Sequence, residues 1–205
     1  MKLYGASQSP FDRTVRVVLE EKGIPYETEH LAPASKTPEL LALHPMGKIP
    51  ILRDGDVVVP DSSVICAYLE KKHPSPALYP ADPAEFARAL FLEEYADTQL
   101  NEVMRALVFE RFVKPNLLQQ ATDASRVQEL LEHALPPVMD YLESQLPGDR
   151  DTALTRFSIA DAALGAQLAR LTVADIEIDA RRWPHTARYS RVLLARPSFK
   201  TAMAQ

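Results

Sequence analysis

Two helix starts carry the polar side chains of this sequence that are best placed for chemistry. Asp61 and Ser62 follow an apolar run and precede a helix expected over 64–72. The first NH groups of a helix lack partners within it, so this start is expected to bind an anion, with Asp61 or Ser62 as its cap. Ser9 and Pro10 form the second start, because serine is a preferred N-cap and proline is favoured at the first helical position. Plain capping is the alternative interpretation at both places.

Ile49 and Pro50 precede a β-hairpin and are expected to shape a peptide-binding edge. Apolar runs at 51–52 and 57–59 flank an Asp-Gly pair at 54–55, which is typical of a tight hairpin turn. Proline cannot donate to a sheet ladder, so Pro50 belongs at the start of its strand, and we predict a cis Ile49–Pro50 bond. That bend would leave the Ile49 main chain facing outward, free to pair with an extended peptide. An ordinary hairpin entry is the alternative.

Alternating strands and helices are expected to position these residues. The sequence predicts strands at 2–4 and 26–30, helices at 10–22, 38–43 and 64–72, and the hairpin between the last two helices. This order is typical of a compact α/β sheet. A proline cluster then predicts a linker at 73–82.

The second half of the chain is predicted to be helical throughout. A helix over 83–114 would span roughly 45 Å, too long for one small sheet to cover. Pro115 should end or kink it, and Pro136-Pro137 should kink or split a further helix over 125–146. Ser158 and Asp161 resemble a capping box before a helix over 162–171. Two last helices follow it.

Composition excludes several functional classes. The 205 residues include 46% hydrophobic ones, enough for one large or two small domains, and the net charge of −5 gives no basic surface for nucleic acid or an anionic membrane. No apolar run approaches the about 20 residues that span a bilayer. We therefore expect a soluble, intracellular protein without a nucleic-acid or membrane partner. The single cysteine, Cys66, is expected to be a buried thiol, and scattered histidines predict no metal site.

Four segments together resemble the cytosolic glutathione transferases. They are the segment at 9–25, which begins with Ser-Pro-Phe and ends with Glu-Lys-Gly-Ile-Pro, the His-Pro-Met-Gly-Lys-Ile-Pro-Ile-Leu segment at 44–52, Asp-Ser at 61–62, and the capping-box segment at 157–161. Their order and spacing match over nearly the whole chain. The sequence departs from the family at three places: His44 replaces the common Asn, Asp61 the commoner Glu, and Thr155 a frequent Gly. The shorter Asp61 affects how a γ-glutamyl amine would be held.

The resemblance implies the fold, the reaction and the assembly. The fold would be an α/β N-terminal thioredoxin-like domain at 1–76 followed by an all-α C-terminal helical domain at 83–205. The protein would be a cytoplasmic, homodimeric detoxification enzyme that binds glutathione as co-substrate. The homodimer would form through the 61–72 helix and the first half of the 83–114 helix. The enzyme would activate glutathione's thiol as a thiolate for attack on a small, mostly apolar electrophile.

The resemblance also implies roles for individual residues. Ser9 would be the catalytic residue, donating a hydrogen bond to the thiolate, and Ser7 is its rival. Ile49 and Pro50 would pair with the cysteinyl backbone, while Ser62 and Asp61 would receive the γ-glutamyl carboxylate and ammonium. The remaining expected substrate-binding residues are Phe11, then Lys36 and Lys48 for the glycyl carboxylate, and Met104, Phe109 and Phe112 for the electrophile. Ordinary core packing is the alternative for the last three.

Other activities remain open on the same fold. A serine before Pro10 argues against a glutaredoxin-like or dehydroascorbate-reductase-like enzyme, because a hydroxyl forms no mixed disulfide. The alternatives are a glutathione-dependent isomerase, dehalogenase or peroxidase, or a non-enzymatic binding or regulatory protein.

Overall fold

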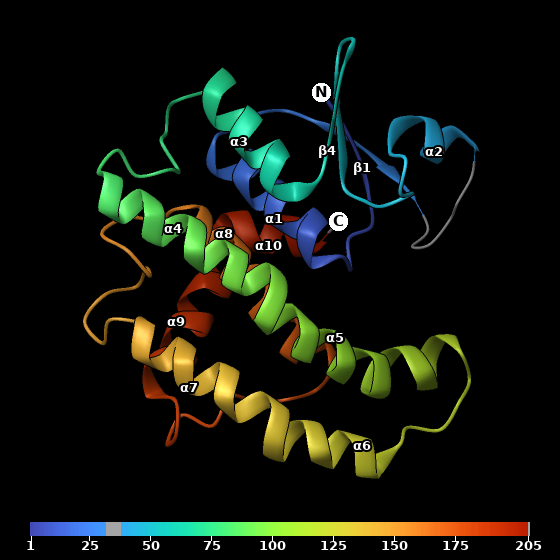
Figure 1. Ribbon diagram of the computed structural model, residues 1–205, viewed down its shortest axis with the longest axis vertical. Helices are drawn as coiled ribbons and strands as arrows, with labels where there is room; N and C mark the ends of the chain where they lie inside the picture. Colours follow the sequence, from blue (N-terminus) through green and yellow to red (C-terminus); the bar gives the residue numbers. More distant parts are fainter. Residues whose placement is uncertain (32–37, 205) are drawn as a thin grey trace. The chain divides into compact units, whose positions relative to one another are not determined.

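The computed structural model describes residues 1–31 and 38–204 (Figure 1). The chain forms two compact units, one of Met1–Phe86 with Arg196–Gln205 and one of Ala87–Ala195. The first contains the sheet and the second is helical, so the predicted fold class is confirmed. The last helix, α10 (Pro197–Ala204), belongs to the first unit, a placement that its sequence did not reveal. The domain limits at 1–76 and 83–205 stay a prediction.

A mixed four-stranded sheet in the order β2-β1-β3-β4 forms the centre of the first unit. Its strands are β1 (Lys2–Gly5), β2 (Glu27–His30), β3 (Ile51–Asp54) and β4 (Val57–Pro60). β1 pairs parallel with β2 and antiparallel with β3, and β3 and β4 form the predicted hairpin. Gly55 in its turn has φ +62°, a conformation that glycine adopts without steric cost.

Helices cover both faces of this sheet. Leu3 pairs with Leu52, so these two side chains share one face, and the neighbouring pair of Tyr4 and Ile51 lies on the other. Leu40 of α2 (Pro38–Leu43) packs against Tyr4 and Ile51. The other two helices of the unit, α1 (Pro10–Glu21) and α3 (Ser62–Lys72), pack against each other, and Figure 1 shows them on the side of the strands opposite α2.

Two ion pairs fix segments that are distant in the sequence to the end of α1. Glu21 of α1 binds Arg196 at 2.9 Å and accepts a hydrogen bond from Ser198, which fixes α10 on α1. The buried Lys22 ammonium lies 2.7 Å from Glu70 and donates to the carbonyl oxygens of His73 and Pro76. The Lys22 contacts therefore fix the start of the predicted linker at the end of α1.

The second unit consists of helices and short π-helical turns. α4 (Pro83–Tyr95) begins in the first unit and continues through η1 (Ala96–Leu100), α5 (Asn101–Val108) and η2 (Phe109–Leu117). The others are α6 (Ala124–Glu129), η3 (Leu130–Ala134), α7 (Leu135–Gln145), α8 (Ile159–Val173) and α9 (Pro184–Ala195). The buried α8 packs against α5 and α9 and forms the centre of the unit.

Prolines coincide with two of the π-helical turns. Pro115 lies inside η2, and Pro136 follows η3 after one residue. Proline removes one helical hydrogen bond and its ring pushes against the preceding turn, so a wider turn relieves the clash. The predicted interruption at Pro136-Pro137 is thus a π turn within a nearly continuous helix, whereas Pro115 lies near the end of its helix, which stops at Leu117.

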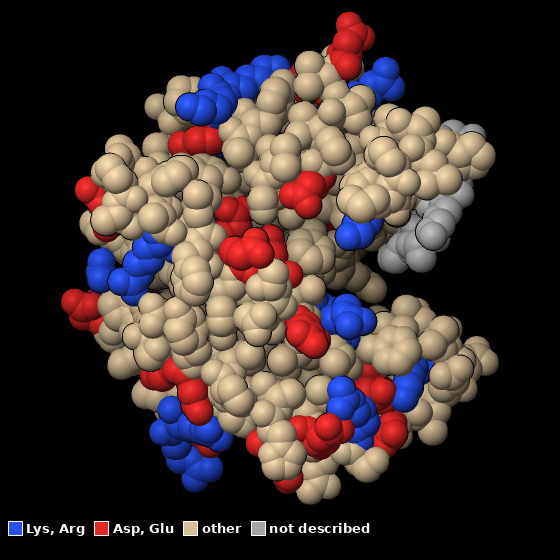
Figure 2. Space-filling view, viewed as in Figure 1, with Lys and Arg blue, Asp and Glu red and all other residues tan. Residues whose placement is uncertain are grey.

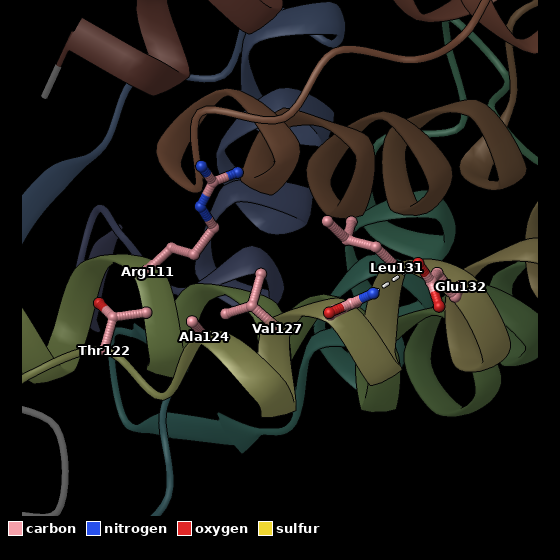
Figure 3. Close-up of a pocket in the computed structure, with 7 residues that line it drawn as sticks. Arg111, Thr122, Ala124, Val127, Leu131 and Glu132 are labelled. Atoms are coloured by element: carbon pink, nitrogen blue, oxygen red, sulfur yellow. Dashed lines mark hydrogen bonds between the residues drawn. The ribbon is translucent and has the colours of Figure 1, made fainter.

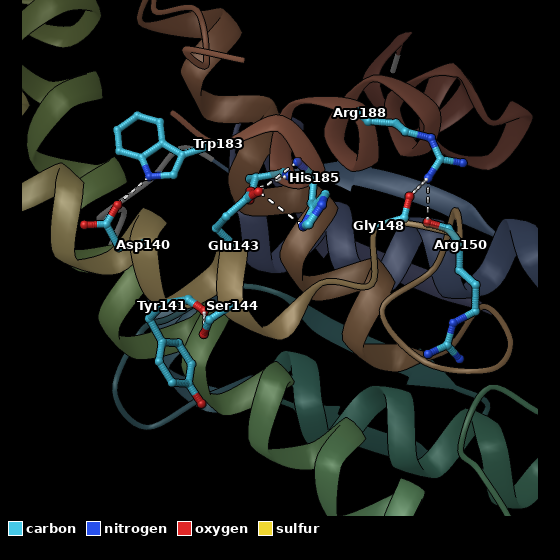
Figure 4. Close-up of polar contacts among 10 residues, drawn as sticks. Asp140, Tyr141, Glu143, Ser144, Gly148, Arg150, Trp183, His185 and Arg188 are labelled. Carbon is cyan, nitrogen blue, oxygen red and sulfur yellow. Dashed lines mark hydrogen bonds and ion pairs between the residues drawn. The ribbon is translucent and has the colours of Figure 1, made fainter. Parts of the chain in front are cut away.

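Polar side chains join α7 to the start of α9 (Figure 4). Asp140 accepts a hydrogen bond of 2.6 Å from the Trp183 indole, and Glu143 accepts from the His185 amide at 2.9 Å. Arg188 of α9 donates to the carbonyl oxygens of Gly148 and Arg150. These contacts also fix the segment that leads from α7 to α8.

The described surface carries mixed charge. Figure 2 shows acidic and basic side chains interspersed over the visible face rather than separated into large areas of one sign. Within residues 1–31 and 38–204, no helix combines the length and the apolar composition needed to cross a membrane.

Candidate active site

Ser9 caps α1, as its sequence predicted. Its backbone is extended, with φ −73° and ψ 125°, and its Oγ accepts a hydrogen bond from the Asp12 amide at 3.4 Å. A hydroxyl that accepts through a lone pair still has its own proton to donate. Capping and donation to a ligand are therefore compatible at Ser9.

Charged residues buried beneath Ser9 fix its loop, and sequence reasoning missed this role. Arg16 binds Asp12 at 2.5 Å with both side chains buried, and Arg13 donates to the Ser7 carbonyl at 3.2 Å. Burial raises the pKa of Asp12, partly offset by the Arg16 guanidinium, and burial lowers the pKa of Arg13. A Cβ at Gly5 would lie only 1.8 Å from Asp12 Oδ1, so this packing requires glycine there. Asp12 and Arg16 lie one helical turn apart, a spacing that favours an ion pair but does not indicate that both side chains are buried.

The Ile49–Pro50 bond is cis, which confirms the prediction. The Ile49 side chain packs against the cluster of Tyr4, Leu40 and Ile51. β3 begins only at Ile51, so the Ile49 main chain lies outside the sheet ladder. This arrangement is compatible with pairing between Ile49 and an extended ligand.

Asp61 and Ser62 form the start of α3. Asp61 Oδ1 accepts from the amides of Ser63 at 3.1 Å and Val64 at 3.4 Å, which makes Asp61 the N-cap. Its φ of 76° is rare for a residue other than glycine and costs about 1–3 kcal/mol. The Asp61 side chain is exposed, whereas Ser62 is only 4% exposed. The strained, exposed carboxylate thus stands beside a nearly buried hydroxyl.

These three segments meet at one end of the sheet. β1 ends at Gly5, just before the Ser9 loop, and the pairing of Tyr4 with Ile51 places this end beside Pro50. The Asp61 amide donates to the Pro50 carbonyl at 3.3 Å. The first unit therefore brings the serine, the cis-proline bend and the α3 start together.

The other predicted site residues differ in their surroundings. Phe11 is partly buried in the first turn of α1, Lys48 is exposed, and Lys36 lies outside the described residues. In the second unit Met104 is 0% exposed, which supports core packing for its side chain. Phe109 is 42% exposed and Phe112 is partly buried.

Cys66 is buried, as predicted. Among the residues that the structure describes, no three His, Cys, Asp or Glu side chains form a group that could hold a metal ion.

Comparison with known proteins identifies the family. A family model described as "Glutathione S-transferase, N-terminal domain" matches residues 3–77. The whole chain is 35% identical to glutathione S-transferase 3 of Zea mays, over 93% of that relative. Over 98% of its length it is 30% identical to maleylacetoacetate isomerase of Pseudomonas aeruginosa, covering 95% of that protein.

A solved structure extends the match to the three-dimensional fold. It is a glutathione S-transferase from Methylobacterium radiotolerans in complex with glutathione sulfonate, with a TM-score of 0.79 and 31% identity over 98% of this chain and 93% of that chain. The sequence resemblance, the sheet unit and these full-length matches agree. The chain belongs to the glutathione S-transferase family and is a transferase of that family.

Proposed function

We propose that this transferase binds glutathione at the end of the sheet in the first unit and uses Ser9 to activate the thiol. The observation that carries the proposal is the geometry of Ser9, whose Oγ accepts from the Asp12 amide and so keeps its proton for a thiolate. The N-terminus of α1 adds partial positive charge at the same place. Both features stabilise negative charge on sulfur.

In the proposed reaction the thiol proton leaves to water or to glutathione's own carboxylate. The thiolate then attacks an electrophilic carbon and forms a carbon–sulfur bond, while a leaving group departs with its electron pair or the π bond of an activated alkene breaks and its carbon is protonated by water. Ser9 is not a base, since it donates a hydrogen bond that is stronger to the charged sulfur than to the thiol. Its contribution is to increase the thiolate fraction at neutral pH.

The rest of glutathione would be held along the same edge. The Ile49 main chain would pair with the cysteinyl residue. Because Asp61 Oδ1 already accepts from the amides of Ser63 and Val64, the γ-glutamyl carboxylate would be received by the Ser62 hydroxyl and the Ser62 amide. Both capping hydrogen bonds at Asp61 end on Oδ1, so Oδ2 would receive the ammonium. Lys48 and Lys36 are the proposed partners of the glycyl carboxylate, and Phe11 would lie near the thiol.

Apolar residues support the proposals for the electrophile and for assembly. Phe109 and Phe112 would contact a small apolar electrophile.

Four large apolar side chains are exposed on α3 and α4, namely Val64, Phe86, Leu90 and Phe91. We propose that they lie in a homodimer interface, because a dimer would remove this apolar surface from water. A cytoplasmic detoxification role is proposed from the family alone.

A glutathione-dependent isomerase is the second candidate. It is favoured by the full-length similarity to a maleylacetoacetate isomerase. The same thiolate would add to a conjugated double bond and leave again, so the proposed roles of Ser9 and Asp61 would not change.

The test of Ser9 separates capping from donation. Ser9→Gly removes the hydroxyl but costs a helix N-terminus only a few tenths of a kcal/mol. If Ser9 donates to the thiolate, this variant should raise the pKa of bound glutathione and slow conjugation about ten- to a hundredfold. Thiolate absorbance and conjugation rates with a series of electrophiles measure both effects.

Ser9→Thr, which keeps the hydroxyl, and Ser7→Ala are the controls. Both should retain most thiolate formation. If Ser7→Ala abolished the thiolate while Ser9→Gly left it intact, the activating hydroxyl would be that of Ser7.

A further inference from the structure

An open cavity of about 340 Å³ lies at the surface of the second unit, between η2 and the helix formed by α6 and η3. Its seven lining residues are Arg111, Thr122, Ala124, Val127, Gln128, Leu131 and Glu132 (Figure 3). Cavities that bind small molecules have volumes of about 300–1,000 Å³, so this cavity is large enough for a small ligand. All of its residues belong to the second unit, whereas the proposed glutathione-binding residues belong to the first.

Both walls of the cavity contain π-helical turns. η2 contributes Arg111, and η3 contributes Leu131 and Glu132. A π turn widens a helix, and such turns are frequent at functional sites. The walls are therefore irregular where their side chains face the cavity.

The two ends of the cavity carry opposite charges. Figure 3 shows Arg111 at one end, Glu132 at the other and Val127 between them. Arg111 Nη1 donates to the Asp175 carbonyl at 3.0 Å, a neutral acceptor. Within the described part of the chain no carboxylate forms an ion pair with Arg111. The fixed guanidinium thus keeps its charge and has further NH donors for a ligand.

We propose that this cavity binds a small amphipathic monocarboxylate. The ligand carboxylate would pair with the Arg111 guanidinium, whose planar fork matches its two oxygens. Its hydrocarbon part would lie on Ala124, Val127 and Leu131. Glu132, whose Oε1 already accepts from Gln128 at 3.0 Å, would repel a second carboxylate at the far end. The charge arrangement therefore selects a monoanion over a dianion of the same length.

Calorimetric titration of the intact protein with decanoate tests the site. The protein is first saturated with S-hexylglutathione, which would fill the proposed glutathione site and carries a hexyl chain in place of the electrophile. Decanoate should still bind, and decanedioate should bind more weakly. Arg111→Gln should weaken decanoate binding about tenfold or more, because a charge-assisted pair is lost. Arg105→Gln is the matched control, since Arg105 is an exposed residue of α5 outside the cavity.

A second variant pair tests the cavity itself. Val127→Phe fills the space between the charged ends and should abolish decanoate binding, whereas Ser125→Phe, on an exposed position of α6, should not. The proposal is overturned if decanoate does not bind, if S-hexylglutathione displaces it, or if decanedioate binds as tightly. Unchanged binding in Arg111→Gln or in Val127→Phe would also overturn it.

Discussion

The N-termini of α3 and α8 each hold an aspartate, in opposite surroundings. At α8, Asp161 is 0% exposed and accepts from the amides of Ala153 and Ser158 and from the Tyr189 hydroxyl, each at 2.8 Å. At α3, Asp61 is exposed, and its two capping hydrogen bonds end on one oxygen. Asp61 is the N-cap of α3, whereas Asp161 is the third residue of α8 and accepts from the amide of its N-cap, Ser158. Among the described residues, hydrogen bonds reach both oxygens of Asp161 but only Oδ1 of Asp61.

This difference separates a structural cap from one that is suited to a ligand. Burial raises the pKa of Asp161 against the opposing effect of its four hydrogen bonds, so the site is costly unless every bond is kept. Asp61 instead holds a strained backbone and an oxygen that a ligand can use. A buried carboxylate with hydrogen bonds to both oxygens stabilises the fold, whereas an exposed carboxylate that uses one oxygen for capping can bind a ligand through the other.

The largest expected effect is that of Asp161→Ala. Four buried donors would lose their acceptor, namely the amides of Ala153 and Ser158 and the hydroxyls of Ser158 and Tyr189. At about 1–3 kcal/mol each, the free energy of unfolding should fall by at least about 4 kcal/mol. Urea unfolding of the variant measures it. Asp149→Ala, at an exposed position of the same unit, should cost less than about 0.5 kcal/mol. If Asp161→Ala were as mild as Asp149→Ala, the distinction between the two kinds of cap would fail.

Glu143 sharpens the comparison because it is a half-buried cap of α9. Burial alone would raise its pKa, but hydrogen bonds from His185 and Thr186 outweigh burial and hold the pKa below its ordinary 4.5. A depressed pKa means that the carboxylate stabilises the fold above about pH 4.5 and loses this effect as the pH falls through the folded-state pKa.

Glu143→Gln should therefore cost about 1 kcal/mol of stability at neutral pH. The difference between the two proteins should shrink in acid. Urea unfolding over a pH series checks this, and a difference that did not depend on pH would show that the charge of Glu143 is irrelevant.

Asp61→Asn should have the smallest effect on stability. Asparagine tolerates positive φ and still accepts the capping hydrogen bonds, so unfolding should change by less than about 0.5 kcal/mol. Because the charge opposite the proposed ammonium is lost, glutathione affinity should fall about tenfold. The pKa of the bound thiol should stay constant.

A glutathione analogue without the γ-glutamyl ammonium is the control for Asp61. It should bind Asp61→Asn and the unchanged protein equally well. If the thiol pKa moved in Asp61→Asn while affinity did not, Asp61 would have a different role.

Local sequence determined most of the elements and the candidate site at the end of the sheet. The Ser9-Pro10 helix start, the Asp54-Gly55 turn and the cis bond before Pro50 were all predicted and are all present. Caps and tight turns depend on residues within about four positions of each other, so a single sequence reveals them. Family resemblance then joined these separate signals into one glutathione site, whose residue roles stay predictions.

Only the tertiary structure decided which of these groups are buried and what they contact. Arg196 meets Glu21 across 175 positions of sequence, and no local pattern predicted that pairing. Burial of Met104 and Asp161 likewise arises from packing. Arg111 faces a cavity because η2, α6 and η3 lie side by side. Burial and long-range contacts depend on elements that are distant in the sequence. The residue pattern of one element does not determine which other elements pack against it.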